Sequence, residues 1–377
     1  MLLALHRDHL AALAARDRLR TLAPRHGVDF SSNDYLALAT APRLRAAATA
    51  ALERGVALGS GGSRLLRGND PEHEALEAEG ARFFGSAAAL FFGSGYAANT
   101  ALFAALPQPG DLLVYDSLVH ASAHDGMRLG RAETVATPHN DADAVDSTIA
   151  AWRARGGTGT PWIAVESLYS MDGDRAPLAD LAAVAERHGA MLVIDEAHAT
   201  GVWGAHGRGL ADTLDGRENV ITLKTFGKAL GCEGALVCCS RLVRDFLVAR
   251  ARPFIFSTAP APLAAAVARA ALAILADEPQ RRQRLHALIA HAGARLGPLG
   301  ATVTGTQVMP LLVGDDRAAL DLAASVQRAG FDVRAIRPPT VPAGSARLRL
   351  SLTLHVGVAE IDSFAEAVAF ATPGARR

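Results

Sequence analysis

The segment Met191-Leu192-Val193-Ile194-Asp195-Glu196-Ala197-His198 decides the fold class, because an uninterrupted apolar run ends in an acidic residue. Such a run is typical of a strand that is buried on both faces, as in a parallel sheet covered by helices. Ligands of these sheets bind at the carboxyl ends of the strands. We therefore expect Asp195 to meet a cationic group of a ligand, such as a protonated pyridine nitrogen, and His198 to turn back toward it. A purely structural Asp195 that caps a helix is the alternative.

Similar apolar runs alternate with helical patterns from about Pro42 onward, which predicts an α/β fold with helices on both faces of the sheet. The expected strands of a large domain with a seven-stranded, mostly parallel sheet lie at 89–92, 112–115, 133–136, 162–165, 191–194, 220–223 and 235–238. After Pro260, two long helical stretches rich in alanine and arginine lead to a different pattern. Strands near 309–313, 331–336 and 347–352, a helix near 318–329 and a closing helix predict a smaller C-terminal α/β domain.

The length of 377 residues is too great for one simple core and favours two unequal domains. We place an N-terminal helix and segment at 1–40, a large domain at 41–275 and a small domain at 276–377.

Charge and cysteine content favour small-molecule chemistry in the cytoplasm. Lysine plus arginine equals aspartate plus glutamate, at 38 each, so no global field would attract nucleic acid or an anionic membrane. The three cysteines, Cys232, Cys238 and Cys239, form no Cys-x-x-Cys pair and are expected to be reduced thiols. Charged residues interrupt the apolar N-terminus at helical intervals, so we expect no signal peptide, and no later run is long enough to span a bilayer.

Only two lysines occur in this arginine-rich chain, Lys224 and Lys228. A lysine amine can lose its proton and become a nucleophile toward a carbonyl, whereas arginine stays protonated. Its neighbours Thr225-Phe226-Gly227 favour such a role for Lys228. For Lys224, chance placement is an equal alternative.

The segment Phe91-Phe92-Gly93-Ser94-Gly95-Tyr96-Ala97-Ala98-Asn99 joins a predicted strand to a helix through a glycine-bearing turn. Such turns expose backbone N–H groups to a phosphate at the positive end of the helix. Tyr96 adds an aromatic ring that can lie near a flat cofactor. Glycines often serve only close packing, so the turn alone is weak support.

Two nucleotide-binding alternatives lack their required motifs. Asp195-Glu196-Ala197-His198 also matches the helicase box, but the chain has no Gly-x-x-x-x-Gly-Lys-Ser/Thr phosphate loop. Gly59-Ser60-Gly61-Gly62-Ser63 follows no strand and lacks the Gly-x-Gly-x-x-Gly spacing, so a dehydrogenase is not expected.

Together, the phosphate turn, Asp195 with His198, and Thr225-x-x-Lys228 resemble the fold-type I pyridoxal phosphate (PLP) enzymes. The resemblance extends from about Ser31 to the C-terminal helix and is closest to the α-oxoamine synthase family. It is carried by Ser32-Asn33-Asp34-Tyr35-Leu36, Gly59-Ser60-Gly61-Gly62-Ser63, His120-Ala121-Ser122, Tyr169-Ser170-Met171-Asp172-Gly173-Asp174, Thr225-Phe226-Gly227-Lys228-Ala229, Ile336-Arg337-Pro338-Pro339-Thr340-Val341-Pro342 and Ala346-Arg347-Leu348-Arg349-Leu350.

The resemblance implies a role for each matching residue. Lys228 would be the Schiff-base lysine, Asp195 would pair with the ring nitrogen, and His120 would stack on the ring. His198 and Ser170 would act beside them as catalytic residues. The other implied cofactor-binding residues are Gly95, Tyr96, Thr225 and Thr258, the last from a segment, Ser257-Thr258, that reaches the phosphate of a neighbouring subunit in a homodimer.

For the substrates, the resemblance implies Asn33, Thr340, Arg349 and Arg20. Arg349 would present a planar fork to the amino-acid carboxylate. Arg20 is placed less firmly, because the chain is short before Phe30 and the hairpin that usually precedes Ser31 is expected to be reduced or missing. No metal site is expected.

The implied reaction is the decarboxylative condensation of L-alanine with a pimeloyl thioester, a step of biotin synthesis. The acyl group would be carried by coenzyme A or by an acyl carrier protein. Within the family, glycine C-acetyltransferase is the nearest alternative, and synthases of 5-aminolevulinate and sphingoid bases follow. Outside it, the alternative is a cofactor-binding protein without turnover.

Overall fold

The computed structural model describes residues 2–372 of the chain, which divide into two compact units. The larger unit comprises Leu36–Ser170 and Asp174–Arg282. The smaller unit comprises Met1–Tyr35, Met171–Gly173 and Gln283–Arg377. The chain therefore leaves the larger unit for three residues at Met171–Gly173 and then returns to it.

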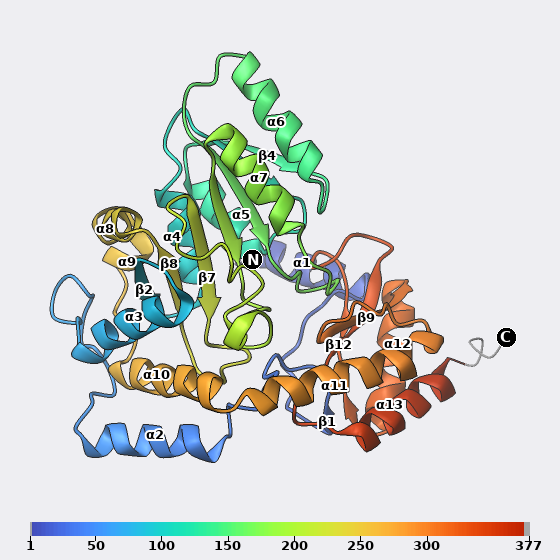
Figure 1. Cartoon of the computed structure of the whole chain (residues 1–377). Coiled ribbons are helices and arrows are strands. Elements are labelled where there is room, and N and C mark those ends of the chain that lie inside the picture. The colour runs from blue at the N-terminus through green and yellow to red at the C-terminus, as the bar shows by residue number, and fades with distance from the viewer. Residues whose placement is uncertain (1, 373–377) are drawn as a thin grey trace. The chain divides into compact units, whose positions relative to one another are not determined.

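A seven-stranded sheet forms the larger unit and confirms the predicted architecture, with the order β2-β8-β7-β6-β5-β3-β4 (Figure 1). Each predicted strand is present, extended by one or two residues. The strands are β2 (Ala88–Phe92), β3 (Leu112–Asp116), β4 (Glu133–Thr137), β5 (Pro161–Glu166), β6 (Met191–Asp195), β7 (Val220–Thr225) and β8 (Ala235–Cys239). Only β8 runs against its neighbours β7 and β2.

Both faces of this sheet are buried, as the unbroken apolar runs predict. Leu113 packs on one face with α4 (Gly95–Ala105), α5 (Ala121–Leu129), α8 (Arg241–Arg250) and α9 (Arg252–Ile255). Leu112 and Val114, its neighbours along β3, pack on the opposite face with α6 (Ala142–Ala154) and α7 (Leu178–His188), and Figure 1 shows these two helices side by side. Residues that alternate along a strand thus feed two separate cores.

Three further helices of the larger unit pack together: α2 (Pro42–Glu53), α3 (Pro71–Phe84) and α10 (Pro262–Asp277). Next along the chain, α11 (Pro279–Leu296) runs from the larger unit into the smaller one. Helices α10 and α11 are the two long alanine- and arginine-rich stretches that the sequence predicts.

The carboxyl edge of the sheet is the edge that matters for ligands. Strands β3 to β7 are parallel, and β2 has the same direction because two successive antiparallel pairings separate it from β7. The segments that follow β2, β3, β5, β6 and β7 therefore all emerge at one edge, where an open α/β sheet binds its ligands.

The smaller unit contains a three-stranded antiparallel sheet with the order β11-β12-β9, built from β9 (Val308–Gly314), β11 (Ala335–Ile336) and β12 (Ala346–Ser351). Helices α1 (Ala4–Ala15), α12 (Asp316–Arg328) and α13 (Val358–Ala371) belong to the same unit. The predicted strand at 331–336 is divided in two, because its halves have different partners. The first half, β10 (Phe331–Asp332), pairs in parallel with β1 (Val28–Asp29), and the second half pairs with β12.

The N-terminal segment before Ser31 contains only the two-residue strand β1 between α1 and that serine, so no hairpin precedes it in the described part of the chain.

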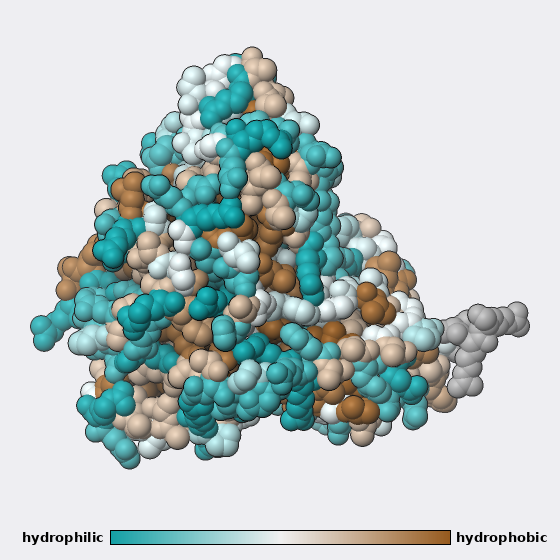
Figure 2. Space-filling model, viewed as in Figure 1, coloured by the Kyte–Doolittle hydropathy of each residue, from teal (hydrophilic) through white to brown (hydrophobic). Residues whose placement is uncertain are grey.

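On the face seen in Figure 2, hydrophilic residues are interspersed with hydrophobic ones. Within residues 2–372, no helix combines the length and the apolar character that crossing a bilayer requires.

Candidate active site

Asp195 ends β6 and is held by two hydrogen-bond donors. The Asn99 side-chain Nδ2 donates to Oδ2 at 2.7 Å, and the backbone N–H of Ala197 donates to Oδ1 at 2.8 Å. Asn99 lies in α4 and is almost fully buried. We did not predict this residue, although a polar side chain on the apolar helix after the glycine turn was a usable signal.

Glu166 is a second carboxyl group beside Asp195, and the two residues are paired in register at the ends of β5 and β6. Burial raises the pKa of Glu166 well above its ordinary value, and the negative charge of Asp195 raises it further. The arrangement therefore favours the protonated form of Glu166. The sequence signal for Glu166 was the same as for Asp195, namely an acidic residue that ends an apolar run.

His120 and Lys228 approach this carboxyl pair from the segments that follow β3 and β7. Burial lowers the pKa of His120, while Asp195 acts to raise it and Lys228 acts to lower it further. The imidazole is held by Ser122, whose Oγ lies 2.7 Å from Nδ1. Lys228 is half-buried and also acts on the pKa of Glu166. The structure thus gathers Asp195, His120 and Lys228 at one edge of the sheet.

The predicted phosphate turn begins helix α4. Gly95 is its first residue, and the Ser94 side chain caps the helix by accepting from the Ala97 N–H at 3.1 Å. A Cβ atom on Gly95 would come within 2.9 Å of Thr225 Cγ2, so a larger residue at this position would require Thr225 to shift. Thr225 itself donates to the Ala197 carbonyl at 3.3 Å. The N–H groups of this helix end and the Thr225 side chain are therefore neighbours.

Ser170, His198 and Thr258 are three other predicted site residues of the larger unit. Ser170 follows β5, and its backbone N–H is a hydrogen-bond partner of Glu166. His198 is buried just beyond Asp195. Thr258 lies in an exposed segment between α9 and α10, which is anchored to the glycine-serine run through the Ala259 N–H and the Gly62 carbonyl at 2.9 Å.

The Tyr96 side chain hydrogen-bonds to Asp125 of α5 and is half exposed. This contact fixes its ring beside α5. We therefore expect Tyr96 to contact a ligand through its backbone N–H at the start of α4.

The predicted substrate residues of the smaller unit form two pairs. Arg349 on β12 is buried and donates through Nη1 to Asn33 Oδ1 at 2.9 Å and to Ser351 Oγ at 2.6 Å. Its Nη2 lies 3.3 Å from the Tyr35 hydroxyl, which also donates to Asn33 at 3.0 Å. We predicted Asn33 and Arg349 but not Tyr35, although it belongs to the same quoted motif.

Arg20 and Thr340 make the second pair, with Nη2 of Arg20 2.9 Å from the Thr340 hydroxyl. Both line a groove of about 720 Å³ in the smaller unit. The groove also takes residues from α12 and from the segment 335–338 that follows β10. Arg20 thus contacts a residue of the motif at 336–342.

Lys224 lies on β7 but is no part of this edge. Its side chain is completely buried, with Nζ 2.6 Å from Glu196 Oε2, 2.9 Å from Asp215 Oδ2 and 2.8 Å from the Arg208 carbonyl. Burial lowers the pKa of Lys224, but the two carboxylates outweigh it and raise the pKa above its ordinary value. Lys224 is therefore a buried structural cation.

Among residues 2–372, no group of three or more histidine, cysteine, aspartate and glutamate side chains has the geometry to hold a metal ion. Cys232, Cys238 and Cys239 are all free thiols.

Comparisons with known proteins agree with this geometry. The family model for aminotransferase class I and II matches residues 25–368. An 8-amino-7-oxononanoate synthase from Anaeromyxobacter dehalogenans (strain 2CP-1) is 45% identical over 97% of this chain and 94% of its own length.

Solved structures show the same fold. Serine palmitoyltransferase from S. paucimobilis, with a bound PLP–myriocin aldimine, matches with a TM-score of 0.89 at 25% identity, over 99% of this chain and 98% of its own. The 8-amino-7-oxononanoate synthase from Francisella tularensis matches with a TM-score of 0.75 at 25% identity, over 91% and 97%. The chain belongs to the class I and II aminotransferase family and, within it, to the group of the 8-amino-7-oxononanoate synthases.

Proposed function

We propose that this protein is a PLP-dependent acyltransferase of biotin biosynthesis. It condenses L-alanine with a pimeloyl thioester and releases carbon dioxide, the free thiol carrier and 8-amino-7-oxononanoate. The observation that carries this proposal is the 45% identity, over nearly the full length of both chains, to a relative of that name. The residues gathered at the carboxyl edge of the sheet supply the chemistry that the reaction needs.

The larger unit fits PLP through three features. The first turn of α4 and Thr225 offer donors to a phosphate, because a helix N-terminus attracts anions. The ionised Asp195 suits a protonated ring nitrogen, and Lys228 suits the aldehyde. When bound, PLP supplies an electron sink for negative charge at the alanine Cα.

The protein's own groups would then handle protons and orientation. We propose that the Lys228 amine removes the Cα proton of alanine. Asp195 would keep the ring nitrogen protonated, and His120 would lie against the ring. His198 and Ser170 are proposed to stabilise negative charge that develops on the acyl oxygen.

In the smaller unit, Arg349 is proposed to bind the carboxylate of alanine. Its guanidinium is oriented by Asn33, Ser351 and the Tyr35 hydroxyl. A preoriented arginine loses little freedom when it binds, which favours a bidentate contact. Arg20 and Thr340, at the groove described above, are proposed to lie along the acyl chain.

We further propose a cytoplasmic homodimer whose subunits share their active sites. Thr258 is exposed, and so is the large apolar side chain of Phe256 two residues before it. Leu58, Leu65 and Leu66, which flank the glycine-serine run that anchors this segment, are exposed too. Exposed apolar side chains of this kind support an interface with a second subunit. The three free cysteines suit a reducing compartment. Light scattering at micromolar concentration would give the mass of a dimer, and a monomer that is fully active would contradict shared sites.

The test of function is a product analysis. Purified protein with PLP receives alanine, glycine or serine, each with acyl thioesters of several lengths on coenzyme A and on acyl carrier protein. Mass spectrometry should detect 8-amino-7-oxononanoate from alanine and the pimeloyl donors. A preference for glycine with acetyl-coenzyme A would replace the proposal with glycine C-acetyltransferase.

A further inference from the structure

A short hairpin after β5 carries Ser170. It spans Ser167 to Ala176 and is closed by backbone hydrogen bonds from the Tyr169 N–H to the Asp174 carbonyl at 3.0 Å and from the Ala176 N–H to the Ser167 carbonyl at 3.2 Å. Side chains from outside the hairpin also contact it and hold its position. Ser170 lies beyond the last bridge of the hairpin, at Leu168 and Arg175.

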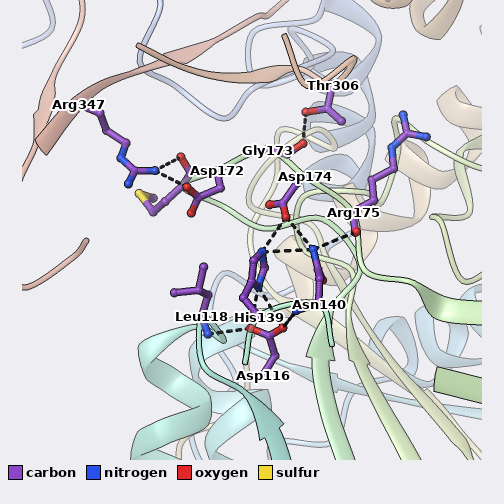
Figure 3. A network of polar contacts seen from close by, with 11 residues as sticks. Asp116, Leu118, His139, Asn140, Asp172, Gly173, Asp174, Arg175, Thr306 and Arg347 are labelled. Atoms are coloured by element: carbon purple, nitrogen blue, oxygen red, sulfur yellow. Dashed lines mark hydrogen bonds and ion pairs between the residues drawn. The ribbon is translucent and has the colours of Figure 1, made fainter. Parts of the chain in front are cut away.

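His139 contacts this hairpin at Asp174, beside its tip (Figure 3). One ring nitrogen, Nδ1, lies 2.9 and 3.0 Å from the two oxygens of Asp116, at the end of β3. The other, Nε2, lies 2.7 Å from Asp174 Oδ2, in the hairpin. The Tyr169 ring meets the His139 ring edge-on, with centroids 4.4 Å apart. A single side chain, from the segment after β4, thus joins the end of β3 to the hairpin that follows β5.

The geometry of this cluster favours a positive charge on His139. Each ring nitrogen faces a carboxylate, and an imidazole donates from both nitrogens only when both are protonated. Burial lowers the pKa of His139, but the contacts with Asp116 and Asp174 outweigh it and raise the pKa to about 10. Asn140 adds a second donor to Asp174, at 2.7 Å. His139 is therefore a cation clamped between two anions.

The tip of the hairpin, Met171–Gly173, is held separately, within the smaller unit. Arg347 of β12 pairs with Asp172 and donates to the Met171 carbonyl at 3.3 Å. The Thr306 hydroxyl donates to the Gly173 carbonyl at 2.8 Å, and a Cβ atom on Gly173 would come within 2.1 Å of the Val308 carbonyl oxygen. Ser170 thus directly precedes the tip that Arg347 holds, and Asp174, which His139 holds, directly follows that tip.

We propose that His139 is a positioning residue for the condensation: its bridge from Asp116 to Asp174 fixes the Ser167–Ala176 hairpin and thereby the hydroxyl of Ser170. This inference rests on the proposed role of Ser170. It gives His139, Asp116 and Asp174 a function that does not require them to touch the substrate or the cofactor.

The test compares His139→Gln with a matched control, His188→Gln. His188 also pairs with one carboxylate, Asp146 at 2.8 Å, but on α7 and away from the hairpin. The first readout is hydrogen exchange of the cofactor-free protein, followed by mass spectrometry of peptides that cover 167–176. We expect exchange about tenfold faster in His139→Gln, because a lost ionic hydrogen bond of about 1.4 kcal/mol corresponds to that factor. The control should match the wild type.

The second readout is a double-mutant cycle with Ser170→Ala. His139→Gln should lower kcat about tenfold at a temperature where the protein stays folded, and it should add little to the loss in the Ser170→Ala background. Asp174→Asn removes one side of the bridge at a partly exposed position and should act in the same way if His139→Gln does not fold.

Several outcomes would overturn the inference. If hydrogen exchange at 167–176 is unchanged in both His139→Gln and Asp174→Asn, His139 does not fix the hairpin. Equal losses of kcat with and without Ser170 would show that His139 acts through something else. If Ser170→Ala alone keeps the wild-type kcat, the role of Ser170 fails and the inference fails with it, whereas product identity would still decide the proposed reaction.

Discussion

Replacing Lys224 by methionine should destabilise the protein severely without touching the proposed chemistry. Methionine is close to lysine in length and fills the space, so the change removes the charge and little else. It leaves Glu196 and Asp215, whose side chains are 0% and 3% exposed, without the cation that neutralises them. Breaking a buried ion pair by removing one partner costs about 3–5 kcal/mol.

The remaining contacts keep the cost within that range. Glu196 Oε1 still accepts from the N–H groups of Leu210 at 2.8 Å and Ala211 at 3.1 Å. Asp215 still accepts from the Thr222 hydroxyl at 2.6 Å. We therefore expect the ratio of folded to unfolded protein to fall by roughly a hundredfold to several thousandfold, since about 1.4 kcal/mol corresponds to a factor of ten.

The assay is urea unfolding of the cofactor-free protein, because bound PLP would add stability of its own. Lys228→Met is the matched control, since it changes the chain's other lysine, which is only half-buried, and should cost little stability. A double variant, Lys224→Met with Asp215→Asn, should be less destabilised than the sum of the single variants, because it removes one of the two stranded charges. A loss below about 1 kcal/mol for Lys224→Met would refute the view that this cluster behaves as a buried ion pair.

Four further predictions concern the proposed site and the His139 bridge. Lys228→Arg keeps the charge but should abolish borohydride trapping of PLP on the protein, whereas folded Lys224→Arg should retain it. Asp195→Asn should lower kcat more than tenfold, because an amide cannot hold a ring nitrogen protonated, and a smaller loss in steady-state assays would make Asp195 structural. Arg349→Lys should raise the KM for alanine strongly, since an ammonium lacks the bidentate fork, while the absorbance of bound PLP is unchanged. A change in PLP absorbance as large as the change in KM would contradict a role in substrate binding alone. The contacts of His139 raise its pKa to about 10. Its contribution to stability is therefore fully present below about pH 6.5 and is lost as the pH rises through about 10. The melting temperatures of the wild type and His139→Gln should converge near pH 10.

The sheet was predictable from sequence because its strands are buried on both faces. Continuous apolar runs then mark each strand, and the structure extends them by only one or two residues. The smaller unit was less predictable at 331–336. There, the short strands β10 and β11 are defined by different partners, β1 and β12, and pairing between distant segments leaves no local signal.

The site residues that the sequence did not reveal are those defined by tertiary contacts. Asp195, Lys228 and Arg349 stand in motifs or at strand ends, where sequence alone carries information. Asn99 acts through a tertiary contact with Asp195 that joins residues 96 positions apart. Tyr35 lies in the same motif as Asn33, but only Asn33 was predicted to bind substrate. Neither contact is visible without the fold.

The two lysines show what the sequence could and could not distinguish. Both lie where arginine would be expected from the composition, and only four positions separate them. The Lys224 ammonium is surrounded by two carboxylates and a carbonyl, and the Phe84 ring centroid lies 5.0 Å from it. A compact ammonium with three donors suits these three acceptors, whereas the planar and longer guanidinium would displace the buried groups around it. Lys228 lies beyond the strand end, half-buried, where its charge acts on His120 and Glu166. Lysine is thus favoured at one position for the geometry of its charge, and at the other for its ability to lose it.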